Sequence, residues 1–199
     1  CFDKTGTLTE NRMAVVVAVA GDAVYDLAEA GLDNREDGIA SSGNGDLFAL
    51  AQTVSLCNQA QTDHGSGTEQ ALLDFAAQAG VAVEDLRGER PMREVRGRNH
   101  RRRWMASEHL RKGQPRVYIK GAPDELLDFA VLERRDGDTH LLSDERRQAI
   151  LAQNQELAAR GLRVLGVGYA DATLADGPSR NFVWQGLVGL ADPLRYEAR

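Results

Sequence analysis

The first nine residues, CFDKTGTLT, carry side chains that could receive a phosphoryl group. A carboxylate at Asp3 is followed by Lys4, Thr5 and a glycine. A carboxylate oxygen can attack phosphorus while neighbouring N–H groups and hydroxyls hold the phosphate oxygens, and a lysine adds a compact positive charge. By itself a short Asp-Lys-Thr-Gly string is usually a turn, so this interpretation depends on the rest of the chain.

A second candidate is Lys120, which follows the strand-forming residues 117–119 and precedes Gly121. A lysine delivered by a strand beside a glycine can bring its ammonium close to a phosphate or a flat ligand. Pro123 then favours the first turn of a helix. In isolation the pattern also fits a surface lysine in front of a helix.

Three weaker segments carry polar residues at the boundaries of predicted elements. In chain order they contain Thr68 and Glu69, then Arg163 and Leu165, then Asp192 and Arg195. As purely structural features, the first pair would be an N-cap threonine and an acid in a first helical turn. The second pair opens a predicted strand, and the third pair follows the last strand.

Hydrophobic periodicity predicts the elements that position these residues. The predicted strands are 13–20, 22–28, 117–119, 162–169 and 182–190, the predicted helices are 47–57, 68–79, one from 123 onward and 144–158, and 33–46 is a polar loop. Gly21-Asp22 is typical of a hairpin turn. Because the helices are spread unevenly among hairpin-like strands, we expect an α+β (mixed α/β) fold, with a largely antiparallel twisted sheet flanked by helices.

Composition narrows the functional classes. The net charge of −6 argues against broad binding to nucleic acid, and the two cysteines, without a CxxC pair, argue against a disulfide framework or a zinc site. No apolar run approaches the roughly 20 residues of a membrane span. Locally, residues 87–103 hold eight arginines and two acids. This stretch is either a solvated strand face or a positive field for a polyanion such as ATP.

The string DKTGTLT resembles the phosphorylation signature of P-type ATPases, and TENRM after it is similar to calcium, magnesium and sodium/potassium pumps. The resemblance implies that Asp3 forms an aspartyl-phosphate, with Lys4 and Thr5 beside it. Phosphatase relatives carry a second aspartate at the position of Thr5, as acid/base. Its absence argues for a long-lived phospho-intermediate.

The other segments resemble motifs of the same family in the same order. KGAPDE resembles the KGAPE motif of the nucleotide-binding domain, GTEQALL the GDPTExALL segment, GLRVL the GLRxL segment and DPLR the hinge motif DPPR. The resemblance implies that ATP contacts Lys120, Gly121, Thr68, Glu69, Arg163 and Leu165, and that Asp192 and Arg195 belong to a hinge.

One position departs from the family pattern. Arg102-Arg103-Trp104-Met105 is similar to an RKxM-like stretch, which implies a nucleotide contact by Arg103. Counting back from Met105 puts Arg98 where the family has an adenine-stacking phenylalanine. We expect the Arg98 guanidinium to stack on the base, with a phosphate contact or a solvated surface position as the alternatives. Strand alternation would place Trp104 and His100 on the same face as Arg98.

These motifs lead to one functional hypothesis and two alternatives. We expect residues 1–11 to be a phosphorylation-domain piece with a hinge, 12–187 a nucleotide-binding domain, and 188–199 a hinge and the returning phosphorylation domain. The implied function is ATP binding that presents the γ-phosphate to Asp3 in a cation pump at the cytoplasmic face of a membrane. Mg²⁺ would act in the full-length pump, with Asp3 and Thr5 contributing to its site.

The expected partners are the phosphorylation, actuator and membrane domains of the same polypeptide. We expect the 199 residues alone to be a soluble monomer that binds ATP without turnover. The alternatives are a soluble phosphatase of the HAD superfamily with a cap domain, and a non-catalytic nucleotide-sensing module.

Overall fold

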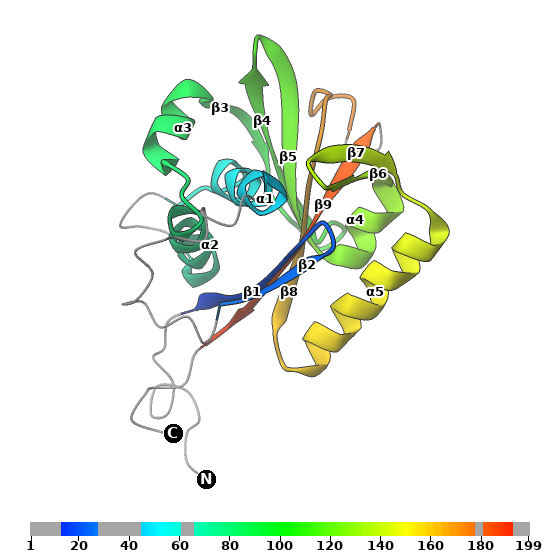
Figure 1. Cartoon of the computed structure of the whole chain (residues 1–199). Coiled ribbons are helices and arrows are strands. Elements are labelled where there is room, and N and C mark those ends of the chain that lie inside the picture. The colour runs from blue at the N-terminus through cyan, green and yellow to red at the C-terminus, as the bar shows by residue number, and fades with distance from the viewer. Residues whose placement is uncertain (1–12, 28–44, 61–65, 178–180, 193–199) are drawn as a thin grey trace, which may run out of the picture.

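The computed structural model describes residues 13–27, 45–60, 66–177 and 181–192 (Figure 1). Its elements are β1 (Ala14–Ala20), β2 (Ala23–Asp26), α1 (Gly45–Leu56), α2 (Gly67–Gln78), α3 (Val83–Glu89), β3 (Met92–Arg96), β4 (Trp104–Arg111), β5 (Gln114–Gly121), α4 (Pro123–Phe129), β6 (Ala130–Arg135), β7 (Asp138–Leu141), α5 (Asp144–Ala159), β8 (Arg163–Ala170) and β9 (Phe182–Ala191). Among these residues, none of the helices combines the length and the apolar character that a membrane crossing requires.

The described strands form one sheet in the order β2-β1-β9-β8-β5-β4-β3, with β6 and β7 joined at the side of β9. Every pairing is antiparallel except that of β6 with β9. Strand β9 pairs with β8 along one edge, while its other edge pairs first with β6, at Phe182–Trp184, and then with β1. Strand β9 therefore lies near the centre of the sheet and pairs with three other strands, β1, β6 and β8.

Helices cover both faces of the sheet, as Figure 1 shows, with α1, α2 and α3 on one side and α4 and α5 on the other. Each face of the sheet carries a hydrophobic core under its helices, and the side chains of β5 alternate between these two cores. Tyr118 packs with the α1–α2 side, whereas Val117 and Ile119 pack with the α4–α5 side. Lys120 continues this alternation and points toward α1 and α2, which places it on the side of the pocket described below.

The structure confirms the predicted α+β fold with a largely antiparallel sheet, and it adds five elements outside the predicted strands and helices: α3, β3, β4, β6 and β7. Helix α3 has only seven residues and buries only Leu86, so it shows no repeating apolar face. The β6–β7 hairpin turns at Asp136 and Gly137, which both have positive φ angles of 54° and 83°. An Asp-Gly pair is a recognised hairpin signal. Gly45 and Asp46, predicted as loop, begin α1, and most of that loop lies outside the described residues.

The first and last described strands lie side by side. Ala14 of β1 pairs with Ala191 of β9, so the chain enters and leaves the sheet at neighbouring positions. Strand β9 continues to Ala191, past the expected domain boundary at residue 187. The division into nucleotide-binding domain and flanking segments stays a proposal, and in it residues 188–191 contribute to the sheet.

His109 makes the stability of this fold depend on pH. The imidazole is buried, with Nδ1 2.7 Å from the carbonyl oxygen of Arg90 and Nε2 3.0 Å from Oγ of Ser107. Burial, the largest cause, lowers the pKa of His109 below its usual value, and the nearby Arg87 and Arg90 lower it further. The native state therefore favours the neutral ring, whereas the unfolded chain takes up a proton at an ordinary pKa.

We expect the free energy of unfolding to be highest above the unfolded-state pKa of about 6.5. It should fall as the pH drops from there to the lower native pKa. Urea titrations between pH 7.5 and 5 check this, and His109→Gln should flatten the slope. His100→Gln, which changes an exposed histidine, is the control and should leave the slope unchanged. An equal slope in wild type and His109→Gln would contradict the assignment.

Candidate functional site

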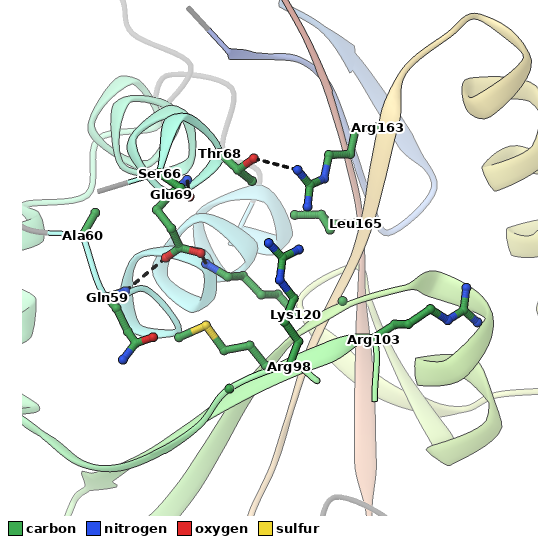
Figure 2. Close-up of a pocket in the computed structure, with 13 residues that line it drawn as sticks. Gln59, Ala60, Ser66, Thr68, Glu69, Arg98, Arg103, Lys120, Arg163 and Leu165 are labelled. Carbon is green, nitrogen blue, oxygen red and sulfur yellow. Dashed lines mark hydrogen bonds and ion pairs between the residues drawn. The ribbon is translucent and has the colours of Figure 1, made fainter. Parts of the chain in front are cut away.

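A pocket of about 410 Å³ lies between the N-terminus of α2 and the sheet, on the α1–α2 side. Elements far apart in the sequence meet there (Figure 2). They are the segment after α1, the start of α2, both ends of the β3–β4 connection with the start of β4, the end of β5 and the start of β8. The lining residues are Gln59, Ala60, Ser66, Thr68, Glu69, Gly97, Arg98, Arg103, Met105, Lys120, Gly121, Arg163 and Leu165.

An ion pair between Lys120 and Glu69 crosses the pocket from β5 to α2. Nζ of Lys120 lies 2.7 Å from Oε1 of Glu69, and the two side chains are only 5% and 19% exposed. Apart from this carboxylate, no acceptor in the described part of the chain contacts the Lys120 ammonium. Burial raises the pKa of the neighbouring Cys57 thiol to about 11, although Lys120 opposes the rise. The thiol thus stays neutral, and among the described residues Glu69 is the anion that pairs with Lys120.

The segment after α1 holds Glu69 in place. The Asn58 side-chain amide donates to the Glu69 carbonyl at 2.8 Å, and the backbone N–H of Gln59 donates to Glu69 Oε2 at 3.1 Å. Arg87 of α3 fixes this segment by donating to the carbonyl oxygens of Ser55, Asn58 and Ala60. Burial lowers the Arg87 pKa from its usual value. The guanidinium bonds these carbonyl oxygens, and Arg87 is not among the lining residues of the pocket.

The first turn of α2 brings two further polar side chains to the pocket. Ser66, and not the expected Thr68, caps the helix, and its Oγ accepts from the Glu69 N–H at 3.3 Å. Ser66-x-x-Glu69 is the sequence pattern of a capping box, which identifies Ser66 from sequence. Since it is free of capping, the Thr68 hydroxyl accepts a hydrogen bond of 3.1 Å from the Arg163 guanidinium of β8.

Gly121 lines the pocket where β5 passes closest to β4. A Cβ at this position would lie 2.4 Å from the Cα of Trp104 and 2.7 Å from the Arg103 carbonyl oxygen, so only glycine fits. Arg103 itself is bound to the start of α4, with its Nε 2.7 Å from Glu125 and its terminal nitrogen 2.5 Å from Asp124. These hydrogen bonds raise the Arg103 pKa above its usual value.

Arg98 lines the pocket, but the expected common face of Arg98, His100 and Trp104 is wrong. Residues 97–103 form a turn closed by a bridge between Asn99 and Arg102, so strand alternation does not apply. Trp104 is 7% exposed and packs edge-to-face against Phe129 in the opposite core. His100 is exposed and does not line the pocket. Figure 2 shows the Arg98 side chain extending between Lys120 and Leu165.

The described residues give the pocket an excess of positive charge. Four cationic side chains line it (Arg98, Arg103, Lys120 and Arg163) against the single carboxylate of Glu69. Met105 and Leu165 add apolar surface, and no aromatic ring is among the described lining residues. A cavity with cations, a carboxylate and apolar walls suits an organic anion that also carries a hydrogen-bonding ring system.

The eight residues singled out from sequence as nucleotide contacts all line this one pocket: Thr68, Glu69, Arg98, Arg103, Lys120, Gly121, Arg163 and Leu165. Sequence reasoning missed five lining residues: Gln59, Ala60, Ser66, Gly97 and Met105. Of the eight arginines in residues 87–103, only Arg98 and Arg103 reach the pocket. Asp3, Lys4, Thr5 and Arg195 lie outside the described residues, and Asp192 is the last described residue of its segment.

Within the described part of the chain, no group of three His, Cys, Asp or Glu side chains converges. The two residues implied in Mg²⁺ binding, Asp3 and Thr5, are outside it.

Comparison with known proteins places this fold and pocket in a family. Residues 46–197 match the family model described as "P-type ATPase, cytoplasmic domain N". Over 98% of its length the chain is 29% identical to the human (Homo sapiens) sodium/potassium-transporting ATPase subunit alpha-4. Over its full length it is 29% identical to a calcium-transporting ATPase of Bacillus subtilis and to the cation-transporting ATPase pma1 of Synechocystis.

The chain spans only 22% to 25% of the length of these curated relatives. The family model covers most of the chain, including every described lining residue of the pocket. The chain therefore belongs to the P-type ATPase family, as a cytoplasmic N domain.

Proposed function

We propose that this domain binds ATP in the pocket between α2 and the sheet and serves a P-type cation pump. The observation that carries the proposal is the convergence of eight motif residues, from four separate stretches of sequence, around one cavity. The relatives are named as sodium/potassium-, calcium- and cation-transporting ATPases, which supports a cation as the transported substrate.

In this proposal the lining residues contact different parts of the nucleotide. Lys120 and Arg163 supply positive charge for the triphosphate, since both are cationic and each has only one described partner in the pocket. Glu69 supplies an acceptor for donors on the base, and Leu165 and Met105 supply apolar contact. Gly121 lets β5 lie close to β4 at the edge of the pocket, because a Cβ there would meet Trp104 and Arg103.

The chemical step in this proposal takes place on Asp3. A carboxylate oxygen attacks the γ-phosphorus of ATP in line with the leaving oxygen, an aspartyl-phosphate forms, and ADP departs. Mg²⁺ would neutralise phosphate charge, with Asp3 and Thr5 near it in the full-length pump. The N domain contributes by positioning, because it holds the nucleotide while Asp3 receives the phosphoryl group.

We expect ATP to bind the 199-residue chain with a dissociation constant of roughly 0.1 to a few millimolar, about −4 to −5.5 kcal/mol. Lys120→Ala should weaken binding about tenfold, because a charge-assisted contact to phosphate is lost. An NMR titration measures both, and the shifted resonances should cluster at Glu69, Lys120 and Arg163.

The matched control is Lys112→Gln, which changes an exposed lysine in the β4–β5 turn. Its affinity for ATP should equal that of wild type. If several millimolar ATP shifts none of the pocket resonances, the assignment of this pocket to ATP is wrong.

A further inference from the structure

Arg87 lies on α3, which packs beside α1 and α2 (Figure 1). Its guanidinium donates to the carbonyl oxygens of Ser55 at 3.0 and 3.2 Å, of Ala60 at 2.9 Å and of Asn58 at 3.4 Å. Helix α1 has no basic residue in its last turn, so Arg87 supplies from another helix the cation that suits a helix C-terminus. Taken alone, these contacts join α3 to the end of α1.

The segment that Arg87 holds contacts Glu69 on its other side. The Asn58 side-chain amide donates to the Glu69 carbonyl at 2.8 Å, and the backbone N–H of Gln59 donates to Oε2 of the Glu69 carboxylate at 3.1 Å. Asn58 is buried, so a lost partner would not be replaced by bulk water. This segment therefore lies between α3 and the pocket, and its position determines that of the Glu69 carboxylate.

The Glu69 carboxylate has one contact that can fix its orientation. Among the described residues it bonds the Gln59 N–H and the Lys120 ammonium, which lies 2.7 Å from Oε1. A lysine ends in a point charge on a flexible stem, so Lys120 follows the carboxylate. The Gln59 N–H belongs to the backbone and is placed by the segment that Arg87 holds.

We propose that Arg87 is a positioning residue for nucleotide binding, because it fixes the Glu69 carboxylate through residues 58 and 59. The inference rests on the proposed function, in which Glu69 accepts hydrogen bonds from the base. It makes affinity depend on α3, although Arg87 does not line the pocket. The role requires an arginine, since its five donors in a fixed fork reach several carbonyl oxygens at once.

The test measures ATP and adenosine binding by NMR titration of the 199-residue chain, in wild type and Arg87→Met. Arg87→Met should weaken ATP binding about fivefold, a size typical of residues that act through their neighbours. Adenosine should lose the same factor, because Glu69 serves the base. The Gln59 amide proton should also shift upfield in the unliganded variant, since its hydrogen bond to Glu69 is weakened. An unchanged Gln59 resonance would contradict the inference.

Arg147→Met is the matched control. Arg147 is also a half-buried arginine that donates to backbone carbonyl oxygens, those of Leu127 and Ala130 at the end of α4, under the opposite face of the sheet. Both variants should lower the Tm, but Arg147→Met should keep the wild-type affinity for ATP and adenosine. Arg87→Lys keeps the charge without the fork and should weaken ATP binding about threefold, which provides a test if Arg87→Met does not fold.

A double variant tests whether the effect passes through Glu69. In a Glu69→Gln background the carboxylate that Arg87 positions is gone, so adding Arg87→Met should change the ATP affinity by less than about twofold. A full fivefold loss in this background would show that Arg87 acts by another route, and the inference would fail.

Four further results separate the inference from the proposed function. Wild-type affinity for ATP in both Arg87 variants would remove the positioning role and leave the proposed function intact. An equal loss of affinity in Arg147→Met would assign the effect to lowered stability and overturn the inference. A loss for ATP without a loss for adenosine would assign it to charge near the phosphates, with the same consequence. Absence of ATP binding by wild type would refute the proposed function, and this inference with it.

Discussion

Gly186→Ala is expected to destabilise the domain by about 4 kcal/mol, with a fall in Tm of roughly 10 °C. Gly186 lies in β9 where the strand changes neighbours from β6 to β1, and its φ angle is 152°. A Cβ there would lie 1.9 Å from the carbonyl oxygen of Val19 and 2.8 Å from Leu50. Neither the backbone of β1 nor the packed helix α1 can move aside without breaking other contacts.

Thermal unfolding measured by circular dichroism tests this expectation. Gly161→Ala is the matched control, since Gly161 also has a positive φ, of 79°, but a Cβ there would meet nothing within 4 Å. That variant carries only the backbone cost, about 1 kcal/mol. Similar losses in the two variants would mean that the close approach of β9 and β1 does not limit stability.

Lys120→Met is the second large change, and we expect it to lower the free energy of unfolding by about 2 kcal/mol. The substitution keeps most of the side-chain volume but leaves Glu69, which is 19% exposed, without its cation. Because some water still reaches this carboxylate, the loss should be smaller than for a fully buried pair.

The double variant Lys120→Met/Glu69→Gln should recover most of that loss. A glutamine at this position still offers a carbonyl oxygen to the N–H of Gln59, and no charge remains unpaired. Urea unfolding of wild type, both single variants and the double variant gives the coupling between the two residues directly. If the two single losses simply add in the double variant, the ion pair does not hold β5 to α2.

Local patterns in the sequence are sufficient for much of this fold. The strands β1, β8 and β9 are largely apolar runs, the helices α1 and α2 have apolar residues at helical spacing, and a capping residue such as Ser143 marks where α5 begins. Periodicity fails at α3, since a short helix with one buried residue has no repeating face. It also fails for β6, because buried and exposed residues do not alternate regularly along this strand and its register with β9 shifts between Ala130 and Leu132.

The candidate site could be predicted only as a set of residues, because its members lie in separate elements. Motif resemblance named Glu69 and Lys120, but their ion pair depends on the packing of α2 against β5. The arginine-rich stretch shows the limit most clearly. Residue type makes Arg87 and Arg98 equivalent, whereas Arg87 holds three backbone carbonyls and Arg98 enters the pocket. Tertiary contacts alone separate the two roles.

The pairing of Ala14 with Ala191 also determines how such a domain can be attached to a host protein. Paired positions on antiparallel strands lie about 5 Å apart. A host protein could therefore accept this domain between two loop residues that are themselves only about 5 Å apart. The host backbone continues on the far side of the insertion almost where it left off. A domain inserted through these two strand ends would be joined to its host at one place, at Ala14 and Ala191.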